Sequence, residues 1–427
     1  SALQATLSQA GLARADVVDA RTWFNPQLQI LAPVGVKPFE LVLSAAIEAS
    51  EAGCETIIVE KYAEFVAEGE VHTEFVRVES EHSAMSACVG AAAAGARTFT
   101  ASAANGIELM NEVIFLASSL RMPIVLAVAD RSPSGPINIH CDQTVSLAQR
   151  DTGWIMMYCE NSQEAYDTTL QAFRIGEHAD VQLPVMVMLD GFVLTHTLEN
   201  VYLLEDKVAH KFVGTRVPME IEVGGQKVPL KLDPKTPITI GPLALFDYYL
   251  ETKIQHHEAM ERARPVISAV NDEWAQLSGR KYGDGFLQPF EIDDADAVIV
   301  TFGSTAGTVR HVARQLRAKD KKVGLLKVRT FRPFPSEKIA EALEGVPVVG
   351  VFERTHSIGS LGGPLFNEVR SALYGRDKRP AVLGYYGGLG GRDLHADYFE
   401  TIYKELLKVK QTGKVPPHPV KYISHRE

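Results

Sequence analysis

Short apolar runs alternate with alanine-rich stretches of helical period up to about residue 200. Continuous apolar runs indicate buried strands, and apolar residues that recur every three or four positions indicate helices packed on them. The pattern predicts an α/β domain over residues 26–200 with a mostly parallel sheet. Its expected strands lie at residues 28–31, 74–78, 97–101, 123–129 and 184–189, and its expected helices at 83–94 and 107–120.

The pattern changes over residues 201–290. Residues 219–223 and 228–232 alternate around Gly224-Gly225, which predicts a β-hairpin with a two-glycine turn. A region of helical period and mixed charge follows over residues 243–277. We therefore expect a hairpin excursion and a helical linker here.

A second α/β domain is expected over residues 291–405. Apolar runs at residues 297–302, 322–328 and 346–352 predict strands, with helices near 306–319 and 336–343 between them. Residues 1–25 show no period and are interpreted as an N-terminal arm. Lysines and prolines over residues 406–427 predict an extended tail.

Composition and charge narrow the class of protein. The chain has 427 residues, 46% of them hydrophobic, and a formal net charge of −10 without a basic stripe, which argues against nucleic-acid binding. No signal-peptide pattern is present, and no run reaches the about 18 apolar residues of a membrane span. We expect a cytoplasmic protein without membrane contact. The four cysteines lack C-x-x-C spacing, which favours buried free thiols over a zinc or iron–sulfur site.

Two carboxylates and an imidazole lie between an expected strand and an alanine-rich helix, at Glu79, Glu81 and His82. Ligands of α/β sheets lie outside the carboxyl ends of strands, so these residues are candidates for chemistry. The alternative is structural: Ser80 would cap the helix, and Glu81 would favour the positive end of its dipole.

Arg131 follows another expected buried strand directly. Its planar guanidinium suits a substrate carboxylate, although a salt bridge to Asp130, Asp142 or Asp151 would explain it equally well. We expect no metal site at the consecutive His140-Cys141-Asp142, because neighbouring residues give poor ligand geometry.

A glycine-containing loop over residues 303–308 leads from a strand into a helix. Such a loop can bind an anion through backbone N–H groups, but it lacks both a Walker lysine and the three-glycine dinucleotide motif. Turn geometry is the favoured reason for its glycines.

Five blocks, in order and spacing, resemble a known family: the α subunit of 2-oxoacid:ferredoxin oxidoreductases, the pyruvate synthase group. Two further blocks extend the resemblance to roughly residues 28–400. The blocks are Glu79–Ala87, Gly95–Ala101, Arg131 with Gly135–Ile139, Arg150–Trp154 and Leu189–Phe192, then Gly324–Pro335 and Phe352–Arg354.

This resemblance implies the pyrimidine-binding fold of a thiamine diphosphate enzyme, followed by a transketolase C-terminal-like domain. Glu81 would contact N1′ of the aminopyrimidine and stabilise the imino tautomer, whose exocyclic nitrogen takes the proton from the thiazolium carbon. Arg131 would bind the substrate carboxylate. His82 and Asn105 would line or support the cofactor pocket.

Partner chains are implied as well. A thiamine enzyme holds Mg²⁺ with Gly-Asp-Gly and an asparagine about 25 to 30 residues later, but no asparagine lies between Gly283-Asp284-Gly285 and Asn367. The diphosphate and Mg²⁺ are therefore expected on a β subunit, and the iron–sulfur clusters on γ and ferredoxin-like subunits. Ferredoxin or a flavin- or NAD-linked subunit would accept the electrons, and coenzyme A the acyl group.

The chain departs from the family at the substrate loop. Ala32-Pro33-Val34-Gly35-Val36 has alanine and Gly35 where relatives usually have tyrosine and a substrate-contacting threonine. A wider pocket is expected around Gly35, which favours a bulky or aryl 2-oxo acid such as phenylglyoxylate.

The resulting hypothesis is an α subunit, active only in a complex, for CoA-acylating oxidative decarboxylation of a 2-oxo acid. Pyruvate or a branched-chain 2-oxo acid is the alternative substrate. A non-catalytic assembly subunit is a second alternative, and a free-standing transketolase-like enzyme is disfavoured by the missing Asp–Asn pair.

Overall fold

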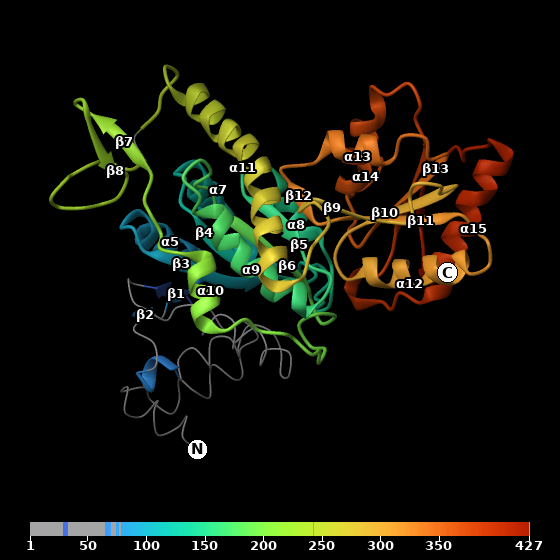
Figure 1. Ribbon diagram of the computed structural model, residues 1–427, viewed down its shortest axis with the longest axis horizontal. Helices are drawn as coiled ribbons and strands as arrows, with labels where there is room; N and C mark the ends of the chain where they lie inside the picture. Colours follow the sequence, from blue (N-terminus) through green and yellow to red (C-terminus); the bar gives the residue numbers. More distant parts are fainter. Residues whose placement is uncertain (1–28, 33–64, 70–73, 77, 242, 427) are drawn as a thin grey trace.

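The computed structural model describes residues 29–32, 65–69, 74–76, 78–241 and 243–426. Two β-sheets lie side by side, and the long helix α11 (Tyr249–Ser278) packs along the helices α7 and α9 of the first (Figure 1). Within this part of the chain no helix combines the length and apolar character that a membrane span requires.

The first sheet has the strand order β12-β5-β6-β4-β3-β1-β2, with β3, β4, β6 and β5 parallel and with β1 and β12 antiparallel to their neighbours. The prediction of a mostly parallel α/β sheet is confirmed. Its strands are β1 Gln29–Ala32, β2 Glu74–Val76, β3 Arg97–Ala103, β4 Ile124–Asp130, β5 Ile155–Tyr158, β6 Val185–Asp190 and β12 Thr330–Arg332.

Helices follow most of these strands, as expected. The single helix predicted over residues 107–120 is wrong, because the chain leaves helical geometry at Met110 (φ −87°, ψ 2°), whose side chain is fully buried. Tertiary packing overrides the local period there. The helices are α5 Glu81–Ala93, α6 Ala104–Leu109, α7 Asn111–Ser119, α8 Thr144–Ala148, the 3₁₀ turn η1 Gln149–Asp151 and α9 Ser162–Gly176.

The expected hairpin stands apart from both sheets in Figure 1. Gly224 and Gly225 have φ values of 59° and 80°, and a two-residue turn of this hand needs positive φ at both positions. The helical linker begins later than predicted, at Tyr249. The elements of residues 201–290 are α10 Asp206–Val213, β7 Glu220–Val223, β8 Gln226–Pro229, α11 and β9 Leu287–Phe290, the last of which belongs to the second sheet.

The second sheet has the order β15-β14-β13-β10-β11-β9, parallel except for β9. The tail beyond residue 406 is not extended throughout, because α15 continues to Thr412 and β15 joins the sheet edge. The elements are β10 Ala297–Thr301, α12 Thr305–Arg317, β11 Val323–Val328, α13 Ser336–Ala342, β13 Val348–Glu353, α14 Pro364–Tyr374, β14 Ala381–Tyr386, η2 Leu389–Gly391, α15 Ala396–Thr412 and β15 Val420–Tyr422.

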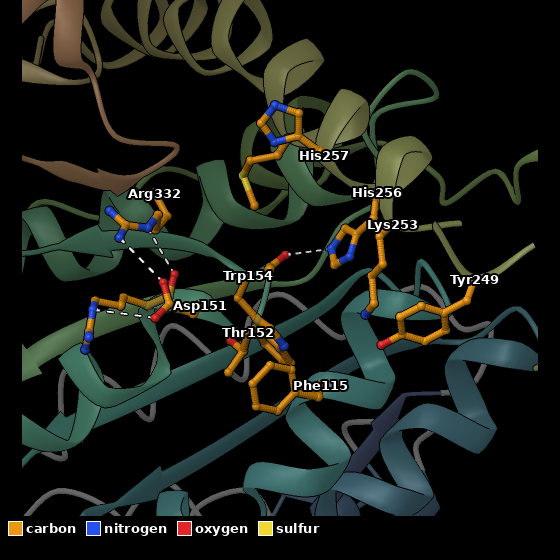
Figure 2. Close-up of a pocket in the computed structure, with 12 residues that line it drawn as sticks. Phe115, Asp151, Thr152, Trp154, Tyr249, Lys253, His256, His257 and Arg332 are labelled. Atoms are coloured by element: carbon orange, nitrogen blue, oxygen red, sulfur yellow. Dashed lines mark hydrogen bonds and ion pairs between the residues drawn. The ribbon is translucent and has the colours of Figure 1, made fainter. Parts of the chain in front are cut away.

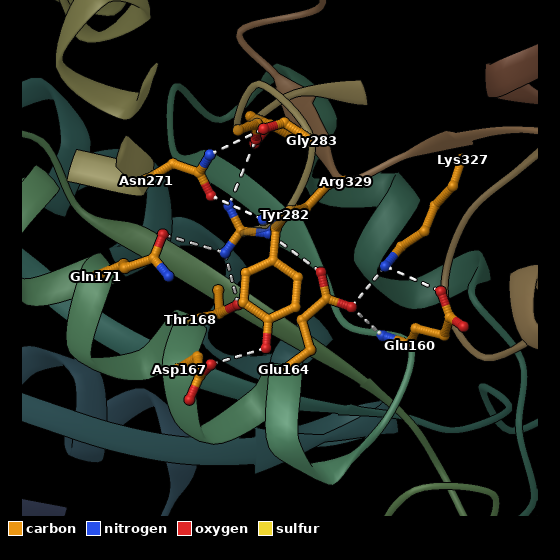
Figure 3. Close-up of polar contacts among 12 residues, drawn as sticks. Glu160, Glu164, Asp167, Thr168, Gln171, Asn271, Tyr282, Gly283, Lys327 and Arg329 are labelled. Atoms are coloured by element: carbon orange, nitrogen blue, oxygen red, sulfur yellow. Dashed lines mark hydrogen bonds and ion pairs between the residues drawn. The ribbon is translucent and has the colours of Figure 1, made fainter. Parts of the chain in front are cut away.

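The two halves are joined by a strand and by buried charge. Thr330 and Arg332 of β12 pair with β5, so a segment from the second half completes the first sheet. Beside it, the buried carboxylate of Glu164 accepts from Lys327 Nζ over 2.6 Å and from Arg329 Nε over 3.1 Å, and Lys327 also pairs with Glu160 (Figure 3). We call Glu160, Glu164, Lys327 and Arg329 the junction cluster.

The loop that starts at Gly303 does bind an anion, but one from the same chain. Ser304 donates its backbone N–H, over 2.8 Å, and its hydroxyl to the carboxylate of Asp190 at the end of β6. Gly303 has φ 65°, and a Cβ there would lie 2.9 Å from the Asp190 oxygens. Both earlier interpretations of this loop therefore hold together: the glycine is required, and the bound anion is Asp190.

Cys88, Cys141 and Cys159 are buried free thiols, as expected, while Cys54 lies outside the described residues. The N-terminal arm, residues 1–25, also lies outside them. The domain boundaries at residues 26, 201, 291 and 406 stay predictions.

Candidate functional site

The carboxyl ends of β2, β3 and β4 meet at one edge of the first sheet. Strands β2 and β3 both run antiparallel to β1, so they are parallel to each other and to β4. The predicted residues Glu81, Asn105 and Arg131 each follow one of these ends. The topology therefore brings them to the same edge, where ligands of α/β sheets bind.

Glu81 is the first residue of α5 and is 6% exposed. Ser80 caps the helix by accepting from the backbone N–H of Ser83 over 3.2 Å, so the structural role expected for Ser80 is confirmed. It does not compete with a chemical role of Glu81, because the cap uses the serine and leaves the glutamate in the first turn. A carboxylate is also favoured there by the helix dipole.

Gly106 in α6 lies directly against Glu81. A Cβ on Gly106 would be 2.9 Å from Glu81 Oε1 and 2.4 Å from Ser102 Oγ, so a side chain there would displace the carboxyl group. Two residues earlier, Ala104 has φ 42°, a left-handed conformation that costs a residue with a Cβ about 1–3 kcal/mol. The turn is thus held in a strained shape beside Glu81.

Asn105 fixes the loop that follows Arg131. Its side-chain amide donates to Ser134 Oγ over 2.5 Å, and its carbonyl accepts from the Ser134 backbone N–H over 3.0 Å. His82 points elsewhere: its Nε2 lies 3.7 Å from a carboxylate oxygen of the exposed Glu112 on α7. Asn105 therefore supports the edge, and His82 lies at its rim.

Arg131 is half-buried, and its Nε donates to the carbonyl of Ile139 over 2.8 Å. Within the described residues it forms no ion pair within 4.0 Å, so the alternative of a structural salt bridge to a nearby aspartate is wrong. A Cβ on Gly191 would be 2.6 Å from Arg131 Cγ, which explains why glycine follows β6 at this point.

Three rings beside Arg131 were not anticipated as site residues. The Phe192 ring is stacked on His196, with centroids 4.0 Å apart and planes 4° apart, and its centroid lies 4.4 Å from that of His140. Phe192 has φ 62°, a second strained position at this edge. Phe192 and His196 follow β6, so the rule of strand carboxyl ends, applied to one more strand, would have indicated them, whereas His140 lies in the loop after β4.

The second sheet also presents strand ends to this edge. The side-chain amide of Asn138 donates to the carbonyl of Gly390 over 3.2 Å, and the N–H of Gly391 donates to the carbonyl of Cys141 over 3.2 Å. Both glycines follow β14. The loop after Arg131 is thereby clamped between the two halves of the chain.

Gly283-Asp284-Gly285 is a structural turn. Asp284 Oδ1 accepts from the backbone N–H groups of Phe286 and Leu287 over 2.9 and 2.8 Å, and Lys338 binds the other oxygen. The carboxylate is thus fully engaged within the chain. Gly35, the expected substrate-loop position, lies outside the described residues.

A separate cavity of about 480 Å³ opens at the other edge of the first sheet, near the amino end of β5. Figure 2 shows Arg332 and Asp151 at one end, Lys253 and Tyr249 at the other, and the imidazole of His256 directed to the loop before β5. That loop precedes the amino end of β5, whereas the predicted residues follow carboxyl ends. None of the predicted site residues lines this cavity.

Two family models match the chain. Residues 55–272 match the thiamine diphosphate-binding domain of pyruvate flavodoxin/ferredoxin oxidoreductases, and residues 295–399 match core domain II of pyruvate:ferredoxin oxidoreductase. The expected fold class, a thiamine diphosphate-binding fold followed by a second α/β domain, is confirmed.

Curated relatives cover most of the chain. Pyruvate synthase subunit PorA of Thermotoga maritima is 46% identical over 373 residues, 87% of this chain and 91% of that protein. Ketoisovalerate oxidoreductase subunit VorA of Pyrococcus abyssi is 41% identical over 361 residues, 84% of this chain and 88% of that protein.

A solved 2-oxoglutarate:ferredoxin oxidoreductase from Magnetococcus marinus has a similar fold, with a TM-score of 0.58 at 17% identity over 90% of this chain and 66% of that one. The family models and the curated relatives identify the group. The chain belongs to the α-subunit family of thiamine diphosphate-dependent 2-oxoacid:ferredoxin oxidoreductases.

Proposed function

We propose that this chain supplies the aminopyrimidine half of a thiamine diphosphate site, which a β subunit completes with the diphosphate and Mg²⁺. The complex decarboxylates a 2-oxo acid oxidatively and passes the acyl group to coenzyme A. Electrons leave through iron–sulfur clusters on γ and ferredoxin-like subunits to ferredoxin or a flavin- or NAD-linked acceptor. The observation that carries the proposal is the buried carboxyl of Glu81 at a strand-end edge shared with Arg131.

The residues at this edge fit one half of the cofactor. Glu81 offers a carboxyl group shielded from water, and Gly106 keeps the space beside that carboxyl clear. The Gly283-Asp284-Gly285 turn does not offer a site for the diphosphate half, because Asp284 already binds backbone N–H groups and Lys338. This division supports a site shared between two chains.

Each residue of the edge then has a task. When bound, thiamine diphosphate supplies the carbon nucleophile that attacks the oxo group of the substrate and accepts the electrons released with CO₂. Glu81 holds a proton at N1′ of the aminopyrimidine, which requires a carboxyl group because an amide does not exchange a proton in this way. Arg131 binds the substrate carboxylate through its terminal nitrogens, and Asn105 keeps the Arg131 loop in place.

The substrate is a 2-oxo acid. The names of the relatives favour pyruvate or ketoisovalerate, whereas the small residues Ala32 and Gly35 favour a bulky or aryl acid such as phenylglyoxylate. A panel of these three acids on the complete complex decides between them. Fastest turnover of pyruvate would reject the proposal of a widened pocket.

The decisive experiment starts with anoxic purification of the complex from its native host. We expect partner chains that include one with Gly-Asp-Gly and the downstream asparagine, and a brown colour from iron–sulfur clusters. A colourless homo-oligomer without 2-oxo acid turnover would contradict the proposal.

Glu81→Gln tests the residue that carries the proposal. Loss of the proton-sharing carboxyl should lower kcat about 10²- to 10⁴-fold, while the complex still assembles. Glu79→Gln is the matched control, because Glu79 is an exposed carboxylate two residues away that binds only Ser83 in the described structure. Near-normal turnover of Glu81→Gln would overturn the assignment.

A further inference from the structure

Phe192, Thr195 and His196 form a hydrogen-bonded series after β6. The backbone N–H of Phe192 donates to Thr195 Oγ1 over 2.8 Å, and this oxygen lies 3.0 Å from Nδ1 of His196. The Thr195 hydroxyl carries one hydrogen, and Nδ1 is the acceptor that the described residues offer it. When the hydroxyl is the donor of this pair, the ring hydrogen of a neutral His196 lies on Nε2.

The surroundings of His196 favour the neutral ring. Partial burial lowers the pKa of His196, and the charges of Arg131 and His140 lower it further. The ring is also fixed in orientation, because it stacks on Phe192. These surroundings favour a neutral imidazole whose Nε2–H is free to donate, within electrostatic reach of the Arg131 guanidinium.

Arg131 and His196 thus present donors that no described residue uses. Arg131 Nε is bound to Ile139, whereas neither of its terminal nitrogens forms a hydrogen bond within the described residues. Nε2 of His196 likewise has no partner there. Both side chains follow carboxyl ends of adjacent parallel strands, β4 and β6.

We propose that His196 is a second substrate-binding residue, whose Nε2–H donates to the carboxylate held by Arg131. Thr195 is a positioning residue that selects the required tautomer. This inference rests on the proposed function, because it concerns the same 2-oxo acid. One charged and one neutral donor then bind the two oxygens of one carboxylate.

Equilibrium binding of oxamate, an unreactive analogue of pyruvate, to the assembled complex tests the inference by calorimetry. Gln at position 196 can place its amide nitrogen near the position of Nε2, whereas Asn reaches only the position of Nδ1. We expect His196→Asn to weaken oxamate binding about tenfold and His196→Gln to weaken it less than about threefold. Thr195→Val should also weaken oxamate binding, whereas Thr195→Ser, which keeps the hydroxyl, should bind oxamate like the wild type.

Two controls test whether the effect depends on the carboxylate of the ligand and on the position of the histidine. Oxamide lacks the charge, so its binding should not distinguish His196→Asn from the wild-type complex. His311→Asn replaces another exposed histidine, on α12, whose partner is Gln315. It should leave oxamate binding unchanged.

The outcomes separate the two proposals. If Arg131→Met weakens oxamate binding but both His196 variants bind like the wild type, the role of His196 is wrong and the proposed function stands. Equal losses in His196→Asn and His196→Gln would also overturn it, because the donor at Nε2 would not be the cause. A wild-type complex that neither binds oxamate nor turns over any 2-oxo acid would overturn the proposed function itself.

Discussion

The junction cluster and the strand-end edge are both rich in charged or polar groups, but they are satisfied to different degrees. In the junction cluster, the cations Lys327 and Arg329 contact the carboxylate of Glu164, and all three are at most 1% exposed (Figure 3). At the edge, Arg131 and His196 keep donors that no described residue uses. The first site is complete within one chain, whereas the second has the unpaired donors expected of a binding site.

The backbone shows the same difference. Ala104 and Phe192 hold left-handed conformations at the edge, whereas the four residues of the junction cluster have none. Strained residues persist only where surrounding structure enforces them, and they concentrate at functional sites. The edge therefore carries backbone strain that the junction cluster lacks.

The largest effect on stability is expected from Glu164→Gln. Removing this charge leaves Arg329 without an ion pair among the described residues and Lys327 with Glu160, which Arg310 shares, so we expect a loss of about 3–5 kcal/mol in the free energy of unfolding. Chemical denaturation measures it. The control is Glu273→Gln, which removes an exposed ion pair with Arg174 at 3.6 Å and should cost less than about 1 kcal/mol. Equal losses in the two variants would contradict the importance of the junction cluster.

Glu353 is an intermediate case, a buried carboxyl that forms no ion pair with any described residue. It accepts the backbone N–H groups of Leu365 and Phe366 at the start of α14, and burial raises the pKa of Glu353 to about 7. Between the ordinary value of 4.5 and this value the native state binds the proton and the unfolded state does not. The stability contributed by Glu353 is therefore present below pH 4.5 and is lost as pH rises to about 7, by about 3 kcal/mol.

Glu353→Gln sharpens this case, because glutamine does not titrate. The unfolding free energy of the wild type minus that of Glu353→Gln should fall by about 3 kcal/mol between pH 4.5 and 7.5. A difference that stays constant over this range would show that the carboxyl ionises normally when buried.

The smallest effect on stability is expected from Arg131→Met. The substitution removes one hydrogen bond and no ion pair, so the free energy of unfolding should change by less than about 1.5 kcal/mol. Oxamate binding to the complex should nevertheless weaken at least about tenfold, because a charge-assisted contact is lost. A large loss of stability would assign Arg131 to the scaffold.

Much of the fold could be predicted from the sequence. Continuous apolar runs located β3, β4, β6, β10, β11 and β13, and Gly224-Gly225 located the hairpin. Those signals are local, since a buried parallel strand needs only a short apolar run. The break at Met110 and the pairing of β12 with β5 depend on distant neighbours, and no local pattern encodes them.

Only part of the candidate site could be predicted from the sequence. Glu81 and Arg131 directly follow strands that the pattern reveals, and the resemblance to a family named their tasks. His196 follows β6 and could have been found by the same rule, whereas the hydrogen bond between Thr195 and His196 is not visible in the spacing of residues. The salt bridge considered for Arg131 failed for a related reason: its loop folds back so that a carbonyl, that of Ile139, meets the guanidinium.

The pairing of β12 with β5 has a consequence for how this protein moves and how its gene can change. A strand from the second half is hydrogen-bonded into the first sheet, and the carbonyl of Arg329 accepts from the N–H of Tyr158 over 2.8 Å beside it. Moving the two halves apart would break the hydrogen bonds between β12 and β5, so a hinge motion between the halves is not expected. A recombination point near residue 291 would not divide the gene into two independently folding domains, because the first domain would lose β12, the edge strand of its sheet.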